Sequence, residues 1–524
     1  MKKVRWIQFI SLLSILMLLM QACSTGSSEE KDNKDDNNSA SNSENGGILK
    51  IVRLSDATGL DPHFITDIPS ANIVHGKVYE TLVAFDKDMK ITPRLAKEWE
   101  QTDELTWEFT LQEGIVFHDG TPFNAEAVKI TLERLLDPAT GSPQKDKLGM
   151  ISEVIAKDDT HLTIKLSEPY APLLSILASN EGSIISPKSI KETPDELATH
   201  PVGTGPFIFD SWKSGQQITL NKNEEYWGEK VKIDSVEFKV IPEDATRLAM
   251  IESGEAHISD QVPVTEIDRI ENSDTLNLFR TDGLAVEYVG FNTTKAPFDN
   301  VLVRQAVSYA IEREAIIEGV YNDIGTLANV AMSPKVFGYS KDVKAYPYDV
   351  NKAKALLKEA GLENGIKIKL LTSDRKERIN MAEVIQSQLK GVGVDVEIQV
   401  MEYGSYIEQV DSGEHQMFIG GWGNATGDGD YNQYNLFHSN SIGSPGNHFY
   451  YQNPAVDKLI EQGRVETDAN KRLEIYEQSM QIEMDDAVYV PIRNYEHLAV
   501  YNNNVENFWL DASNYLILNE ATVK

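Results

Sequence analysis

The chain has 524 residues, of which 41% are hydrophobic and 25% are charged, so it is long enough for roughly two to four structural units with substantial cores. Its 81 acidic and 49 basic residues give a net charge of -32, which repels phosphate and anionic lipid headgroups and excludes nucleic acid as a partner. A single cysteine excludes an intramolecular disulfide and a zinc cage built from thiolates.

Residues 1–22 predict a lipoprotein signal peptide. Basic residues open the segment, and the mostly apolar run 6–20 is short for a transmembrane helix. The only cysteine, Cys23, follows in a context that resembles a lipobox. We therefore expect Cys23 to be acylated and to become the first residue of the mature protein, with a free cysteine behind an ordinary secretory signal as the alternative.

Residues 23–47 predict a disordered tether. After Cys23 the segment consists almost wholly of Ser, Gly, Asn, Asp, Glu and Lys, and it has no aromatic or large aliphatic residue. Such a segment cannot offset its ordering entropy by burial. The expected outline is a globular body, lipid-anchored on a flexible tether to the outer face of the cell membrane.

From residue 47 onward the chain predicts an α/β fold, because strand-like runs alternate with amphipathic helical stretches. The expected strands are 48–52, 107–111, 162–166, 236–241 and 367–371, and the expected helices are 124–136, 303–317, 352–360, 381–390 and 471–484. No segment of this body is long and apolar enough to predict a transmembrane helix.

The C-terminal half shows a regular order of elements. Residues 348–365 predict a helix that leads into a strand at 366–371, and residues 381–391 predict a second helix that leads into a strand at 394–400. Helix, strand, helix and strand in this order are typical of a doubly wound lobe.

The sequence carries few signs of catalysis. It lacks the G-x-S-x-G, H-E-x-x-H, P-loop and G-x-G-x-x-G motifs. Its 10 histidines include no pair spaced three or four residues apart. We therefore expect no enzymatic activity, no cofactor and no metal site, although ligands distant in sequence can converge in a fold.

One segment combines the residue types of a pocket for a zwitterion. Between 420 and 431, glycines that allow close backbone approach stand beside Trp422 and the acids Asp428 and Asp430. Similar clusters of turn-forming and aromatic residues at 117–124, 203–212 and 223–228 are better interpreted as scaffold.

An ordered set of motifs resembles the family 5 solute-binding proteins of ABC importers, which take up dipeptides, oligopeptides, glutathione and nickel chelates. The motifs are LDP at 60–62, FHDGTPF at 117–123, PVGTGPF at 201–207, NEEYW at 223–227, TRLAM at 246–250, PFDN at 297–300 and YDVNKA at 348–353. The resemblance covers essentially the whole body. The stretches 201–212, 241–247 and 425–430 look most like the glutathione-binding branch.

The resemblance implies a two-lobed periplasmic-binding-protein fold of type II, with an extra subdomain in the first lobe. Lobe I would comprise 47–284, with the subdomain at about 80–200, and the return segment 496–524. Lobe II would comprise 285–495. Two crossover strands, near 286–290 and 492–497, would join the lobes, and the ligand would be enclosed between them.

The resemblance also suggests ligand-binding residues after the tryptophan. In dipeptide-type relatives, an aspartate three residues after the tryptophan that matches Trp422 takes the ligand ammonium. Here that position is Ala425, which agrees better with the glutathione-like pattern. Asp428 or Asp430 is expected to substitute, although Asp430 could instead cap the following turn.

Further candidates lie elsewhere in the sequence. Arg378 lies close to where the relatives place the arginine for the ligand carboxylate, and Arg375 is its neighbour. A solvated charge at the start of a helix is the alternative interpretation for each arginine. Tyr403, Thr58 and Gly59 are additional expected pocket residues.

The implied function is that of a monomeric, lipid-anchored binding protein. It would capture a dipeptide, oligopeptide or glutathione-like peptide and deliver it to the membrane permease of an ABC importer with a cytoplasmic ATPase. A receptor for a nickel chelate or opine-type metallophore is the alternative, which Ala425 and the histidines His75, His438 and His448 leave open. An extracellular hydrolase and an adhesin or chaperone-like surface protein are competing classes.

Overall fold

The computed structural model describes residues 46–444 and 446–524, which belong to one compact unit. The predicted signal peptide, Cys23 and the tether up to residue 45 lie outside the described residues. At its start the described chain is already attached to the body, because Gly46 donates a backbone hydrogen bond to Lys232 and Gly47 donates one to the Asp234 carboxylate.

An 11-stranded sheet runs through the molecule. Its strands lie in the order β15 (Val394–Met401), β14 (Ile366–Ser373), β16 (Met417–Gly423), β12 (Leu276–Phe291), β17 (Tyr489–Asn502), β11 (Ile258–Ser259), β1 (Ile48–Arg53), β10 (Ser235–Val240), β9 (Gln217–Lys222) and β8 (Phe207–Lys213), and β13 (Thr326–Leu327) also pairs with β17. Segments from the start, middle and end of the chain are therefore neighbours in one sheet.

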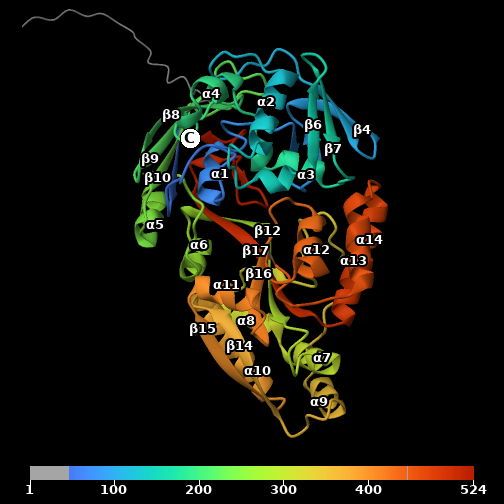
Figure 1. The fold of residues 1–524 in the computed structure, drawn as a ribbon. Helices are drawn as coiled ribbons and strands as arrows, with labels where there is room; N and C mark the ends of the chain where they lie inside the picture. The colour runs from blue at the N-terminus through green and yellow to red at the C-terminus, as the bar shows by residue number, and fades with distance from the viewer. Residues whose placement is uncertain (1–45, 445) are drawn as a thin grey trace, which may run out of the picture. The chain divides into compact units, whose positions relative to one another are not determined.

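Strands β12 and β17 connect two groups of elements, as Figure 1 shows. They pair in antiparallel fashion, and their register shifts between Asp282 and Val286 and again between Glu287 and Tyr288. Irregularities of this kind bend and twist a strand pair locally. The predicted crossovers at 286–290 and 492–497 fall on these two strands.

The group of elements at the bottom of Figure 1 contains the predicted helix–strand–helix–strand order. Helix α9 (Val350–Glu359) leads into β14, and α10 (Lys376–Lys390) leads into β15, with β14 and β15 parallel. Met381, Ile385 and Leu389 recur at helical spacing on α10 and are fully buried in the core on this side of the sheet. The expected order of helix, strand, helix and strand is confirmed.

The expected helix 303–317 is wrong as a single element. The structure has two helices instead, α7 (Val301–Ala310) and α8 (Arg313–Tyr321). Between them Ile311 is fully buried and its backbone is extended. The chain turns there because α7 packs mainly on α9, whereas α8 packs mainly on α10 and β17.

A second, antiparallel sheet lies in the upper group of elements (Figure 1). Its order is β4 (Ala96–Asp103), β5 (Thr106–Leu111), β7 (His161–Leu166) and β6 (Ile151–Ala156), and helix α2 (Ala125–Leu136) contacts β6. The side chain of Asn124 caps α2 by accepting a hydrogen bond from the Ala127 N–H at 3.0 Å. Buried residues alternate along β5, so one face of this sheet packs into its own hydrophobic core.

The remaining elements complete both groups. They are α1 (Ile68–Val74), β2 (Val83–Phe85), β3 (Ile91–Pro93), α3 (Leu173–Ala178), α4 (Pro187–Glu192), α5 (Asp244–Ser253), α6 (Ile267–Glu271), α11 (Tyr403–Asp411), α12 (Gly429–Phe437), α13 (Pro454–Val465), α14 (Ala469–Asp485), β18 (Val505–Glu506), β19 (Trp509–Leu510), β20 (Leu516–Ile517) and β21 (Thr522–Val523). Within the described part of the chain, no helix is both long and apolar enough to cross a membrane.

Candidate ligand-binding cleft

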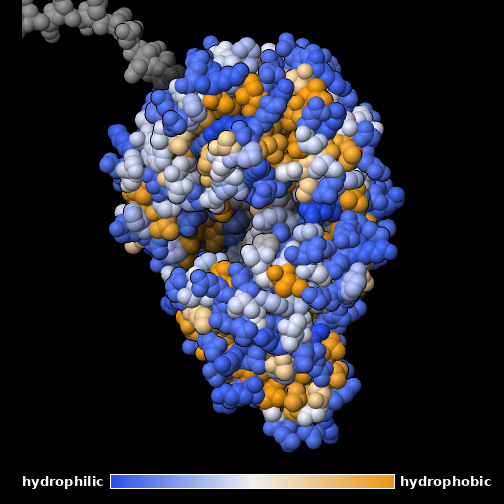
Figure 2. Space-filling model, in the orientation of Figure 1, coloured by the Kyte–Doolittle hydropathy of each residue, from blue (hydrophilic) through white to orange (hydrophobic). Residues whose placement is uncertain are grey.

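A cavity of about 480 Å³ lies where the two groups of elements face each other, and we call it the first cavity. The surface in Figure 2 is hollowed at this level. Upper-group segments that line it are 65–68, 75–85, 92–94, 178–181 and 509–519, and the residues opposite are 284–285 and 423–427. Because the walls of this cavity come from both groups of elements, a ligand held here would contact both groups.

One wall of the first cavity carries a carboxylate that is fully engaged inside the protein. The buried Glu80 accepts hydrogen bonds from Tyr226 at 2.7 Å, Trp227 at 2.8 Å and Thr204 at 2.9 Å. It also forms an ion pair with Arg94 at 2.7 Å. With every partner supplied by the protein, Glu80 positions Arg94 at the cavity wall and is not free to bind a ligand cation.

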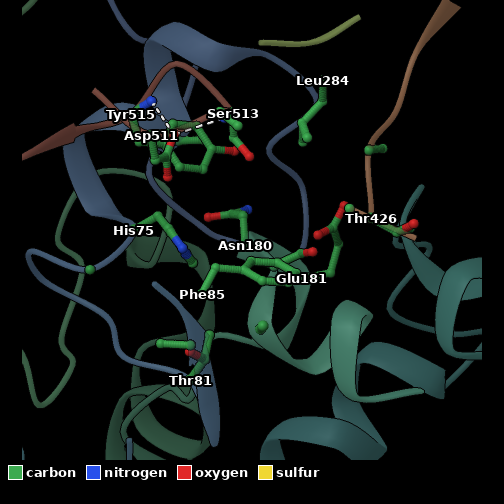
Figure 3. Close-up of a pocket in the computed structure, with 18 of the residues that line it drawn as sticks. His75, Thr81, Phe85, Asn180, Glu181, Leu284, Thr426, Asp511, Ser513 and Tyr515 are labelled. Atoms are coloured by element: carbon green, nitrogen blue, oxygen red, sulfur yellow. Dashed lines mark hydrogen bonds between the residues drawn. The ribbon is translucent and has the colours of Figure 1, made fainter. Parts of the chain in front are cut away.

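A second carboxylate of the first cavity, Asp511, lies in the turn between β19 and β20. Its Oδ1 accepts backbone hydrogen bonds from Ser513 at 2.9 Å and Tyr515 at 2.8 Å, drawn as dashed lines in Figure 3. Burial raises the pKa of Asp511 to about 6, against a smaller lowering by those hydrogen bonds. The carboxylate is therefore ionised at neutral pH.

A second cavity, of about 330 Å³, contains a cluster of arginines around one buried acid. Glu287, only 1% exposed, accepts a hydrogen bond from Arg378 Nε at 3.3 Å and another from Arg493 Nε at 3.0 Å. Its oxygens also accept from the hydroxyls of Tyr321 at 2.8 Å and Tyr495 at 3.2 Å. Two guanidinium groups share this carboxylate, so some of their N–H groups remain available to an anionic ligand group, although Asp260, Glu377 and Glu496 also line the cavity.

The charge state of Arg378 is fixed by this arrangement. Burial is the largest single influence on the pKa of Arg378 and acts to lower it, but the negative charge of Glu287 together with Tyr495 and Tyr406 holds the pKa above its usual value. Arg378 and Arg493 both line the second cavity, as does Arg375. An anionic ligand group there meets permanently charged donors.

His497 on β17 lines both cavities. Its Nε2 is 3.2 Å from the carbonyl of Ala512, and burial lowers the pKa of its imidazole to about 4, so the ring is neutral at pH 7. The turn at 513–514 also contributes to both cavities. Together they form one cleft with an acid in one half and arginines in the other, within the size range of small-molecule sites.

A family model for bacterial extracellular solute-binding proteins, family 5 Middle, matches residues 90–444. The chain belongs to family 5 of the bacterial extracellular solute-binding proteins. Proteins of this family are binding proteins of transport systems and not enzymes, and the family description places its members outside the cell. The recognition of the family from its motifs is confirmed.

Among curated relatives, the glutathione-binding protein GsiB of Escherichia coli O1:K1 / APEC is 31% identical over 465 residues, which cover 87% of this chain and 90% of that protein. The solved structure of HbpA2 from Haemophilus parasuis matches with a TM-score of 0.85 and 27% identity, over 91% of this chain and 100% of that one. DppA from Helicobacter pylori, solved in complex with the peptide STSA, matches with a TM-score of 0.72 and 30% identity, over 91% and 99%. These matches confirm the two-lobed α/β fold.

Three of the residues that the sequence predicts to bind the ligand line the cleft. Ala425 lines the first cavity, and Arg375 and Arg378 line the second. Tyr403 is not among the residues that line these cavities. It lies beside Arg375, whose guanidinium carbon is 5.3 Å from the centre of the tyrosine ring, and it is 46% exposed.

Trp422 is not among the residues that line the described cavities. It stands near the end of β16, and its ring centre lies 5.4 Å from that of Tyr431. A Cβ at Gly446 would come within 2.8 Å of the indole, so the ring is closely packed. Its Nε1 is buried without a hydrogen-bond partner among the described residues.

The two acids after Trp422 form contacts inside the protein. Asp428, 2% exposed, receives two hydrogen bonds from Arg472, at 2.6 and 2.7 Å, and caps α12. It lines a third cavity of about 440 Å³, away from the arginine cluster. Burial raises the pKa of Asp430 to about 6, and the Nε of Arg464 is 3.8 Å from its carboxylate. In this conformation neither carboxylate lines the first or second cavity.

Thr58 and Gly59 also lie outside the residues that line these cavities. The Thr58 hydroxyl donates to the Asp67 carboxylate at 2.6 Å, and its backbone N–H donates to the Ser70 hydroxyl at 2.9 Å. These bonds hold the loop against the start of α1, where Asp67 is the N-cap.

Several cleft residues were missed by sequence reasoning, among them Glu287, Arg493 and Asp511. A local signal existed for Glu287, because it is the single charged residue in the apolar run 284–291. A lone charge inside a buried strand requires ionic or hydrogen-bond partners, so it predicts a buried polar cluster at this position. The described part of the chain contains no group of three or more His, Cys, Asp or Glu side chains arranged to hold a metal ion.

Proposed function

We propose that this protein captures a small peptide, glutathione or a related peptide between its two lobes. The observation that carries the proposal is the cleft itself, which offers a carboxylate in one cavity and arginines in the adjoining one. A peptide has the complementary groups, an ammonium and carboxylates. The similarity to a glutathione-binding protein and to a peptide-bound DppA supports this choice.

The proposed lobes keep the boundaries expected from the sequence. Lobe I comprises 47–284, including the subdomain at about 80–200, and 496–524, and lobe II comprises 285–495. Because β12 and β17 are the long strands that pass between the lobes, bending at their register shifts would close the cleft on the ligand.

A thermal shift experiment on the purified protein tests the ligand class. Reduced and oxidised glutathione and di- to pentapeptides are offered separately, and a ligand at 100 times its dissociation constant should stabilise the fold by about 2.7 kcal/mol. Arg378→Ala should lose the shift for peptides with a free carboxylate and keep its fold by circular dichroism. If no peptide and neither form of glutathione raises the melting temperature, the proposed ligand class is wrong.

A metal chelate or opine-type metallophore is the second candidate. The observation that favours it is the presence of His75 and His497 at the first cavity, together with Ala425 in place of an acid. In the same thermal shift series, stabilisation by nickel–histidine with no response to peptides would select this alternative.

We further propose that Cys23 is acylated and that the lipid holds the monomeric protein at the outer face of the cell membrane. The closed form would then deliver its ligand to the permease of an ABC importer. Anchoring is tested by detergent phase partition of the protein from its native host. Wild type should enter the detergent phase, and Cys23→Ser should remain in the aqueous phase. Equal partition of both would contradict the anchor.

A further inference from the structure

We propose that Asp511 binds the cationic amine of the ligand and so selects ligands with a free ammonium group. This inference rests on the proposed function, because it assigns one end of the ligand in the same cleft. The acid comes from the C-terminal turn of lobe I, far in sequence from the segment after Trp422 in which an acid was expected.

The geometry of the turn holds Asp511 ready for a ligand. Its backbone N–H donates to the Tyr515 carbonyl at 3.0 Å, and its Oδ1 accepts the two backbone hydrogen bonds from Ser513 and Tyr515. Within the described residues, Oδ2 has no hydrogen-bond partner. Figure 3 shows Asp511 in the cavity wall near His75 and Tyr515. One oxygen fixes the orientation, and the other is left to accept from a bound group.

The other acids of the first cavity already have partners in the protein. Glu80 is bound by Arg94 and three further donors. Glu181 forms an ion pair with Lys147. Asp67 accepts from Ser70 and Thr58 at the start of α1. Among the described residues, no cationic side chain lies within ion-pair distance of Asp511, and the charge of Lys77 acts on its carboxylate only from beyond that distance.

The groups that face Asp511 match its negative charge only in part. The Nζ of buried Lys77 lies 3.4 Å from the Asn72 amide oxygen, and burial lowers the pKa of this amine to about 7, against a smaller raising by the charge of Asp511, so the amine is only partly protonated at neutral pH. Burial also lowers the pKa of His75 to about 3, so its imidazole is neutral. Burial raises the pKa of Tyr515, so its phenol is neutral as well. A ligand ammonium would supply the missing charge in a setting partly shielded from water.

The position of Asp511 also defines the orientation of the ligand. With the ammonium at Asp511 in lobe I, a carboxylate can reach Arg378 or Arg493 in lobe II through the part of the cleft lined by His497. A ligand with both groups bridges the lobes and favours closure, whereas a ligand without the amine contacts the arginines alone.

Calorimetry with paired ligands tests the proposal on the full protein. The tightest-binding peptide from the thermal shift series is compared with its N-acetylated form, on wild type and on Asp511→Asn, which keeps the shape and the Oδ1 acceptor. Asp511→Asn should weaken binding of the free amine by roughly 10- to 100-fold and change binding of the acetylated form by less than about threefold. Glu181→Gln, in the same cavity, should change the binding of both ligands by the same factor and so keep the wild-type preference for the free amine.

The pH dependence gives a second readout. Because the pKa of Asp511 is about 6, protonation between pH 7 and pH 5 should weaken binding of the free amine more in wild type than in Asp511→Asn, where only Lys77, with a pKa of about 7, still gains positive charge over this range. If Asp511→Asn fails to fold, the wild-type pH profile for the two ligands decides. If both ligands lose affinity equally at low pH, or if neither loses affinity, the proposed role of Asp511 is wrong. Binding of the ligands to wild type would still support the proposed function. Absence of any binding to wild type overturns both.

Discussion

At the scale of single residues, the most informative side chain is Glu287. It lies in the otherwise apolar end of β12, and its two oxygens receive four donors from α8, α10 and β17. Such a buried acid does not stabilise the fold simply by being charged, because its desolvation costs about as much as its partners return. Its role is to orient Arg378 and Arg493 toward the cleft.

Replacing Glu287 with Gln should therefore be costly. The change leaves two buried guanidinium groups without their anion, so we expect a loss of about 3 kcal/mol in the free energy of unfolding, measured by urea denaturation. Lys157→Ala is the matched control, since Lys157 and Glu108 form an ion pair with side chains 46% exposed, and its loss should stay below about 1 kcal/mol. Equal losses for both variants would show that Glu287 does not hold the arginines.

The residues of the cleft were only partly predictable from the sequence. Arg378 and Ala425 could be placed because motifs near them resemble a family whose binding positions follow the chain locally. Asp511 could not be predicted as a cleft residue, because most of the other residues that line its cavity are hundreds of positions away in sequence. Asp428 looked like a free acid beside a tryptophan, but its partner Arg472 lies on α14 and is visible only in the fold.

At the scale of elements, local patterns predicted much of the structure. Strands β1, β5, β7, β10 and β14 and helices α2, α9, α10 and α14 match expected segments, because period and caps are encoded locally. The break between α7 and α8 was not predicted, since Ile311 fits the apolar face of a continuous helix. It is the packing of the two halves on different neighbours that separates them.

The paired strands β12 and β17 come close together at a glycine. A Cβ at Gly283 would lie 2.5 Å from Nε2 of His497, which belongs to the wall shared by the two cavities. This close approach lets the irregular part of β12 lie directly against the ring. A movement at the register shifts would thus act on the residues that contact the ligand.

At the scale of the whole molecule, the acid excess does not indicate the ligand. A net charge of -32 is spread over the chain, whereas the cleft carries both signs of charge, with three arginines in the second cavity and, among the described residues, Asp511 outside any contact ion pair in the first. The global charge keeps the protein soluble and repels polyanions. In the proposed function, recognition depends instead on a few buried charges from both lobes, which would make ligand binding a property of the two lobes together.

Ligand binding should therefore protect both lobes at once. In hydrogen exchange measured by mass spectrometry, we expect a saturating peptide or glutathione to slow exchange at 423–427 and 511–515, which line opposite walls, and at the irregular segment 282–288 of β12. Helix α9, far from the cleft, is the internal control and should exchange as before (Figure 1). Protection confined to one wall, or spread equally to α9, would contradict closure of the two lobes around the ligand, because closure desolvates both walls and leaves distant helices unchanged.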